Sequence, residues 1–225
     1  LPLPWLVGVL FAGMAASSYL VPETAAVPHD PAVPLARIGS VIKRPEVIAL
    51  LIACLCSQMS FAPYYNFFTL FLERHGHARS LAGALWAIAV VAEIVLFVYM
   101  SRLIARFGAR QLLIAALAAT VLRWLLTVAL ADSFAALVVI QMSHALTFGA
   151  YHACAMHYVF RLFPVRLQGR GQAIYNASAY GIGGSLGSLG AGAIWDHVRP
   201  EGTFLIAALI ALIGTWIVWK KVPNL

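Results

Sequence analysis

The sequence predicts an all-α membrane protein that crosses the bilayer seven times. Hydrophobic residues make up 62% of the 225-residue chain and charged residues only 10%, and the mean hydropathy is +0.88. Soluble domains are typically about 45–50% apolar and about 25% charged, and a soluble core of this size could not bury so much apolar side chain. The apolar residues also gather into seven runs with lengths near the roughly 20 residues that a helix needs to cross a bilayer.

The first run, residues 3–21, contains no charged residue and is expected to be a membrane helix. Residues 22–45 follow it and contain five prolines, so we expect a linker rather than a helix there. The other six runs are apolar on most faces, as helices in lipid are, and should form one unit over residues 46–225. These runs are residues 46–72, 81–101, 112–131, 134–160, 171–194 and 203–219.

Lysine and arginine alternate between the two ends of these runs. Eleven of the 15 cations fall on one side of a seven-span topology: Arg37, Lys43, Arg44, Arg102, Arg106, Arg110, Arg161, Arg166, Arg170, Lys220 and Lys221. The other side has Arg74, Arg79 and Arg199, and Arg123 lies within a span. Because cytoplasmic loops carry the excess of cations, we expect a multi-pass protein with a cytoplasmic C-terminus.

Three stretches resemble the second half of a major facilitator superfamily transporter. "YYNFFTLFLERHG" (64–76) is similar to the end of the seventh helix in the lactose-permease-like branch. "SRLIARFGARQLL" (101–113) is similar to the superfamily's cytoplasmic loop motif, although Ala105 and Ala109 replace its Asp and one Arg. "HALTFGAYHACAMHYVF" (144–160) and "GQAIYNASAYGIGGSLGSLGAGAIWD" (171–196) look most like the phenylpropionate transporters of that branch.

This resemblance implies a fold, partners and a function. The seven spans would be the sixth to twelfth helices of a twelve-helix transporter, so residues 1–21 would belong to its N-terminal half and residues 22–45 would be the cytoplasmic linker. The expected partners are a small solute, protons, the bilayer and the missing N-terminal half, with no nucleic acid and no cofactor. The expected location is a bacterial inner (plasma) membrane.

Arg123 lies in the middle of an apolar run, where a charge is expensive and is expected to face the bundle interior and to find a partner. The only acid inside a neighbouring run, away from its ends, is Glu93. The sequence therefore predicts a direct Glu93–Arg123 pair. Such a pair could serve only to hold two helices together, because a buried ion pair is weak evidence for stability or function.

The resemblance to lactose permease assigns roles to the same residues. Its functional Glu, Arg and His on helices eight to ten match Glu93, Arg123 and His144, so that Glu93 and His144 would couple protons and Arg123 would bind solute. The sequence departs from the permease in two ways: Thr147 stands where the permease has a proton-carrying Glu, and Gln58 and Phe61 stand where it has two aspartates. Glu93 would then be the only titratable acid of the coupling machinery.

Five polar or aromatic residues of the run 134–160 fall within one wedge of the expected helix, that is, on one face: Gln141, His144, Phe148, Tyr151 and His152. A cavity lining is one interpretation, and hydrogen bonding between helices is the other. We include His144, Tyr151 and His152 among the candidate solute-binding residues. Neither these nor the other histidines have the spacing of a zinc site.

Two further runs contribute polar or small residues. Residues 46–72 hold Gln58, Tyr64 and Asn66 around Pro63, which can bend a helix, so we add these three polar residues to the candidate solute site. Residues 171–194 carry Gly183 and Gly187 four apart, and also Gly184, Ser188 and Gly192, a spacing that predicts close helix packing.

The most concrete hypothesis is a secondary active transporter, not an enzyme, that imports an aromatic carboxylate such as phenylpropionate together with a proton. A sugar or nucleoside proton symporter is the first alternative. A non-transporting seven-helix receptor or assembly subunit is the second. A retinal pigment is disfavoured, because Lys43, Lys220 and Lys221 all lie at the ends of runs.

Overall fold

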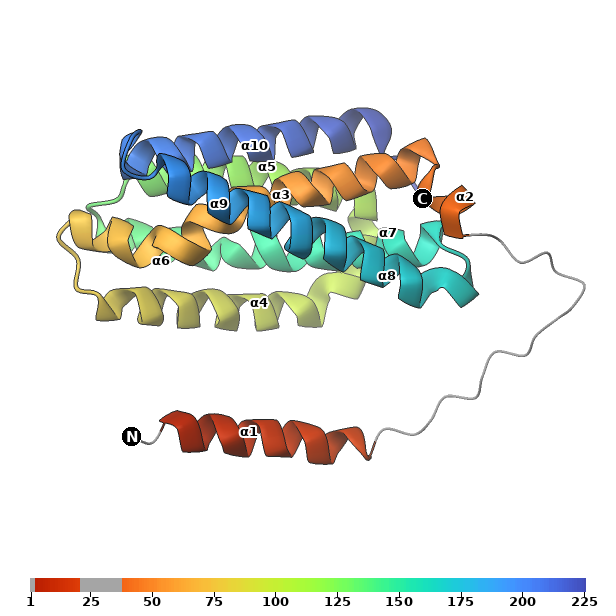
Figure 1. The fold of residues 1–225 in the computed structure, drawn as a ribbon, viewed down its shortest axis with the longest axis horizontal. Helices are drawn as coiled ribbons and strands as arrows, with labels where there is room; N and C mark the ends of the chain where they lie inside the picture. The colour runs from red at the N-terminus through yellow and green to blue at the C-terminus, as the bar shows by residue number, and fades with distance from the viewer. Residues whose placement is uncertain (1–2, 21–37) are drawn as a thin grey trace, which may run out of the picture. The chain divides into compact units, whose positions relative to one another are not determined.

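The computed structural model describes residues 3–20 and 38–225 of the chain (Figure 1). The regular structure within these ranges is entirely helical, which confirms the all-α class. The chain forms two compact units, Leu1–Leu35 and Ala36–Leu225. The first unit contains α1 (Leu3–Ser18), an apolar helix of 16 residues. Most of the predicted linker lies outside the described residues.

The second unit contains the remaining helices, which include two π-helical turns (η1 and η3) and one 3-10 turn (η2). In chain order they are α2 (Ile38–Ile42), α3 (Pro45–Arg74), α4 (Ser80–Phe107), α5 (Ala109–Ala129), α6 (Phe134–Met142), η1 (Ala145–Ala150), α7 (Tyr151–Leu162), η2 (Val165–Leu167), α8 (Gln168–Asn176), η3 (Ala177–Gly183), α9 (Gly184–Ile194) and α10 (Arg199–Lys221).

Five helical stretches of the described residues are long and apolar enough to cross a membrane. They are α3, α4, α5, α10 and the stretch Phe134–Leu162 that joins α6, η1 and α7. The predicted run at 171–194 is instead divided among α8, η3 and α9, and its glycines and serines make it less apolar than the other runs. The apolar part of α1 is also shorter than a span. The count of seven therefore stays a prediction.

The helix α3 is the centre of the second unit, because it is buried over most of its length. It packs against α10 on one side and against η3 and α9 on another. The helix α5 lies between α10 and the η1–α7 stretch, while α4 covers η1 and α6. Arg123, in the second half of α5, contacts Thr147 of η1, and Glu93 on α4 lies beside Gly149 of η1.

A one-residue turn joins α4 to α5. Gly108 occupies it with φ of 80°, a left-handed conformation that favours glycine, and its N–H donates to the carbonyl oxygen of Ile104. Arg110 then donates to the carbonyl oxygens of Val222, at 2.8 Å, and of Trp219. The stretch 101–113 thus binds the C-terminal end of α10.

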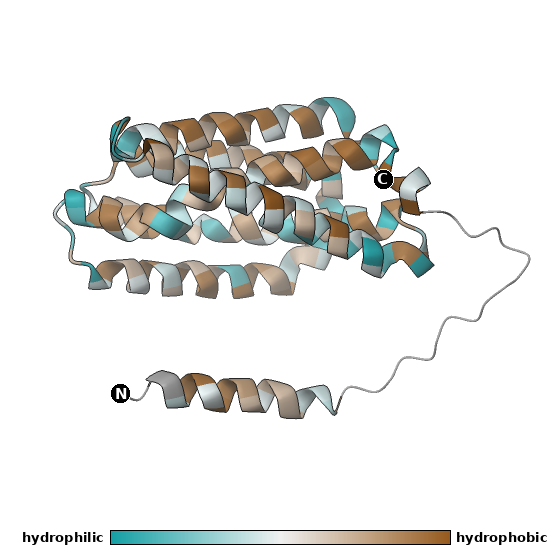
Figure 2. Cartoon of the chain, in the orientation of Figure 1, coloured by the Kyte–Doolittle hydropathy of each residue, from teal (hydrophilic) through white to brown (hydrophobic). Residues whose placement is uncertain are grey.

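Hydrophilic residues gather at the ends of the helices, and apolar residues cover most of their lengths (Figure 2). Many large apolar side chains of the described residues are exposed, particularly along α4. Lipid, rather than water, suits such a surface. The start of α3, the α7–α8 junction and the C-terminus lie at the same end of the bundle (Figure 1).

Candidate functional site

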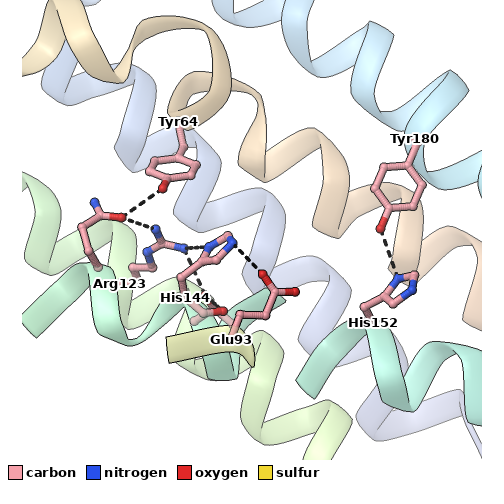
Figure 3. A network of polar contacts seen from close by, with 8 residues as sticks. Tyr64, Glu93, Arg123, His144, His152 and Tyr180 are labelled. Carbon is pink, nitrogen blue, oxygen red and sulfur yellow. Dashed lines mark hydrogen bonds and ion pairs between the residues drawn. The ribbon is translucent and has the colours of Figure 1, made fainter. Parts of the chain in front are cut away.

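Arg123 is buried, with only 2% of the residue exposed, and its guanidinium makes three hydrogen bonds. Nη1 donates to His144 Nδ1 at 2.8 Å and to Thr147 Oγ1 at 3.1 Å, and Nη2 donates to Gln141 Oε1 at 3.0 Å (Figure 3). All three acceptors come from the α6–η1 stretch, which lies beside α5. The sequence singled out Gln141 and His144 but identified Thr147 only as the replacement of an acid.

Aromatic rings surround the same guanidinium. Its carbon lies 4.6 Å from the ring centre of Tyr64, 4.9 Å from that of Trp124 and 5.7 Å from that of Phe61. The Tyr64 hydroxyl also donates to Gln141 Oε1 at 3.0 Å. Ring faces attract cations more strongly where water is excluded, so these rings partly replace the hydration of Arg123.

The predicted direct pair between Glu93 and Arg123 is not what the structure shows. His144 lies between them: its Nδ1 faces Arg123, and its Nε2 lies 3.7 Å from Glu93 Oε2 (Figure 3). Arg123 thus bonds to three neutral acceptors, and its Nε has no hydrogen-bond partner among the described residues. His144 is the direct contact of Arg123 because η1, which follows His144 in the chain, packs against both α4 and α5.

The contacts of His144 determine which ring nitrogen carries its proton. A guanidinium has donors only, so Nδ1 must accept from Arg123. The imidazole in this arrangement is then neutral, with its hydrogen on Nε2 and directed toward Glu93. Because 3.7 Å is longer than an ordinary hydrogen bond, Glu93 is held near His144 without a tight bond.

Gly149 provides the space that Glu93 uses. A Cβ at this position would lie 3.0 Å from Glu93 Cγ, closer than most real contacts. Gly149 belongs to η1, a π-helical turn in the middle of the predicted span. π-Helical turns are rare in proteins overall, but those that occur are frequently found at functional sites.

The π-helical turn η1 changes which residues of the predicted polar and aromatic wedge lie on one face. Phe148 stacks in parallel on His144, with ring centres 5.1 Å apart, and His152 stacks on Phe148 at 6.3 Å. Tyr151 does not join this row, because its side chain is buried against α3 and donates to the carbonyl oxygen of Cys54 at 3.3 Å. The wider turn shifts the residues that follow it relative to the 100° spacing of an α-helix.

His152 belongs to a second polar cluster. Its Nδ1 lies 3.2 Å from the hydroxyl of Tyr175 and 3.2 Å from that of Tyr180 (Figure 3 shows the second contact). These contacts join α7 to α8 and η3. Tyr175 is buried and Tyr180 is exposed, so the cluster reaches the surface of the unit through Tyr180.

Two hollows adjoin these clusters. The first, of about 200 Å³, lies over His144 and has mainly aromatic walls: Tyr64, Tyr65, Trp86, Ala89, Val90 and His144. The second, of about 550 Å³, is more polar and is lined by Gln58, Ala62, Tyr65, Asn66, Tyr180, Gly184, Ser185, Ser188 and Leu189. Of the predicted site residues, Tyr64 and His144 thus line the first hollow, and Gln58 and Asn66 line the second.

Sequence analysis missed Trp86 as a site residue. A signal was available, because Trp86 precedes Glu93 by seven residues and so lies on the same face of α4. Over residues 3–20 and 38–225, no three His, Cys, Asp or Glu side chains come close enough together to hold a metal ion.

Comparison with known proteins gives three matches. Residues 2–206 match the model of the MFS_1 like family. The chain is 32% identical over 178 residues to the "Probable 3-phenylpropionic acid transporter" of Escherichia coli (strain K12), a match that covers 77% of this chain and 45% of that protein. It is 23% identical over 167 residues to the "Uncharacterized transporter YwbF" of Bacillus subtilis (strain 168), covering 73% of this chain and 42% of that protein. The chain thus spans less than half the length of both relatives.

Proposed function

The chain belongs to the MFS_1-like family of membrane transporters, and from this premise we propose that it is the C-terminal half of a proton-coupled importer. The proposed solute is an aromatic carboxylate such as phenylpropionate. In this proposal α1 is the sixth helix of a twelve-helix transporter, and the second unit supplies the seventh to twelfth. The protein lies in a bacterial inner membrane with its C-terminus in the cytoplasm.

The observation that carries the proposal is the environment of Arg123. A buried charge in a membrane protein normally has a partner of opposite sign. Among the described residues, Arg123 instead has three neutral acceptors and an Nε without a hydrogen-bond partner. An anionic solute supplies the missing charge, and a carboxylate suits a guanidinium because it can accept two hydrogen bonds.

The hollow beside this cluster favours an aromatic solute. Tyr64, Tyr65 and Trp86 form walls on which a ring can stack, and His144 forms the side that adjoins Arg123. A solute carboxylate reaches Arg123 from this hollow once Tyr64 or His144 moves aside, because both now cover the guanidinium. The name of the Escherichia coli relative agrees with this class of solute.

Glu93 is the proposed proton carrier. It lies 3.7 Å from His144, which bonds to Arg123 and so connects the two. When a solute carboxylate binds at Arg123, its charge repels the nearby carboxylate of Glu93, and protonation of Glu93 removes this repulsion. Solute and proton therefore load together. Rocking of the two halves around a site at the membrane midplane would then carry both across.

The test is uptake by the full-length protein in proteoliposomes with an inward proton gradient. We expect labelled phenylpropionate to accumulate, and we expect other aromatic acids to compete with it. The neutral analogue 3-phenylpropan-1-ol, which has the same skeleton without the charge, should not compete. Accumulation of a sugar or a nucleoside in place of the aromatic acid would reject this function.

A sugar or nucleoside symporter is the second candidate, and the polar hollow favours it. Gln58, Asn66, Ser185 and Ser188 offer several groups that could bind solute hydroxyls. A neutral solute leaves Arg123 without an opposite charge, and for this reason we rank it second. The same uptake panel separates the two candidates.

A further inference from the structure

The polar hollow lies between α3 and the η3–α9 stretch, away from Arg123. Six of its lining residues carry polar side-chain groups: Gln58, Tyr65, Asn66, Tyr180, Ser185 and Ser188. The proposed carboxylate site does not use this hollow. Its volume of about 550 Å³ is larger than that of the aromatic hollow over His144, about 200 Å³.

Gln58 is the unsatisfied member of this lining. Only 3% of the residue is exposed, and its side-chain Nε2 is buried without a hydrogen-bond partner among the described residues. Asn66, which lies two turns further along α3, differs: its Nδ2 donates to the carbonyl oxygen of Ala62 and to Ser188 Oγ, both at 2.9 Å. A buried amide without a hydrogen-bond partner destabilises a protein. A ligand in the hollow that accepts a hydrogen bond from Gln58 would remove this cost.

Tyr65 connects this hollow to the proposed solute site, because its side chain lines both hollows. It is held partly by stacking on Phe61, with ring centres 5.9 Å apart. An aromatic ring that occupies the hollow over His144 is adjacent to Tyr65. A ring substituent that extends past the Tyr65 side chain would reach the polar hollow.

We propose that the polar hollow binds a hydroxyl group on the ring of the solute, so that the transporter prefers ring-hydroxylated aromatic acids to the unsubstituted acid. Gln58 donates an N–H to the hydroxyl oxygen, and a serine or asparagine oxygen of the lining accepts the hydroxyl hydrogen. This inference rests on the proposed function, because it assumes an aromatic acid at Arg123. A site built to bind a hydroxyl discriminates against the analogue that lacks it, since its buried polar group is then left unpaired.

The experiment compares three solutes on the purified full-length protein. Displacement of labelled phenylpropionate is measured with unlabelled phenylpropionate and with its 3-hydroxyphenyl and 4-hydroxyphenyl analogues. We expect at least one hydroxylated acid to bind about tenfold more tightly, a factor that corresponds to one satisfied buried hydrogen bond. In Gln58→Leu this ratio of affinities should fall to about one.

The ratio is measured within one protein sample, so it does not depend on how much of the variant folds. Gln58→Leu should also fold at least as well as the wild type, because it replaces an unpaired buried amide with an apolar group of similar size. Met59→Leu is the matched control. Met59 is adjacent in sequence but lines a different, apolar crevice between α3, α9 and α10, and this variant should keep the tenfold preference.

Equal affinities for all three acids in the wild type would overturn the inference and leave the proposed function standing. A preference that survives in Gln58→Leu would also overturn it, because the preference would then not depend on the Gln58 amide. If none of the three acids binds, the proposed function and the inference fail together.

Discussion

Arg123 is buried in α5, and its guanidinium donates a hydrogen bond to His144 rather than to Glu93. Its position within an apolar run indicated burial and a polar partner, and the structure confirms both. The identity of the partner was wrong, because the sequence shows which charges lie in spans but not which helix stretch lies between them. The position of η1 between α4 and α5 makes His144, and not Glu93, the direct contact.

The residue-scale prediction concerns this arrangement. Arg123→Leu and His144→Phe should be non-additive, with a coupling free energy of about 1–3 kcal/mol, because the two side chains share a buried hydrogen bond. His144→Phe keeps a ring against Phe148, so the stacking is preserved. A double-mutant cycle on the unfolding of the full-length protein in detergent measures the coupling.

The same cycle for Arg123→Leu and Glu93→Gln should show weaker coupling that disappears in the His144→Phe background. A Glu93–Arg123 coupling that is unchanged when His144 is replaced would mean that the two charges interact directly. That outcome would restore the pair that the sequence predicted.

At the scale of elements, the glycine spacing of residues 171–194 indicated close helix packing, whereas nothing in the sequence indicated the π-helical turns. Gly183 and Gly187 face the backbone of α3, where a Cβ would lie 2.6 Å from the carbonyl oxygen of Leu55 and 2.7 Å from that of Met59, respectively. The second predicted row packs less closely: a Cβ at Gly184 meets nothing within 4 Å, one at Gly192 would lie 3.8 Å from Phe67 of α3, and Ser188 accepts a hydrogen bond from Asn66 of α3. The turns η1 and η3 lie in continuous apolar runs, where no residue pattern distinguishes them from α-helix.

The element-scale prediction uses two glycines three residues apart in α9. Gly187→Ala should lower the free energy of unfolding by about 1–3 kcal/mol, because α3 must move away from the added methyl group. Gly190→Ala places its methyl group in open space and should change stability little or raise it by up to about 1 kcal/mol through helix propensity.

Thermal unfolding of the two variants in detergent separates close packing from helix propensity, because both variants gain the same propensity. Equal effects of the two substitutions would show that α9 does not pack closely on α3.

At the scale of the whole molecule, composition was sufficient for the class of protein but not for the number of spans. Five stretches are long and apolar enough, whereas the run at 171–194 is weakened by the same glycines and serines that let it pack against α3. The boundary predicted at residues 21–22 and most of the linker after it lie outside the described residues. The orientation in the membrane rests on the distribution of cations and stays a prediction.

Labelling tests this orientation. Single cysteines introduced at Arg106 and Arg166 should react with a membrane-impermeant reagent only from the cytoplasmic side, and a cysteine at Arg199 only from the outside. The three native cysteines are buried and should contribute little background. Labelling of position 106 or 166 from outside would reverse the topology and would place the proton-loading step on the wrong side of the membrane.

The most direct test of the central claim is proton-driven accumulation by Glu93→Gln in the full-length protein. Proteoliposomes are loaded with and without a pH gradient, and both uphill accumulation and solute–solute exchange of labelled phenylpropionate are measured. Glu73→Gln, which changes an acid paired with Arg79 at the opposite end of the bundle from the C-terminus, is the control and should accumulate solute normally. Because Gln resembles the protonated acid, Glu93→Gln should keep exchange and lose uphill accumulation. Normal uphill accumulation by Glu93→Gln would contradict the account, because Glu93 would then not carry the coupled proton.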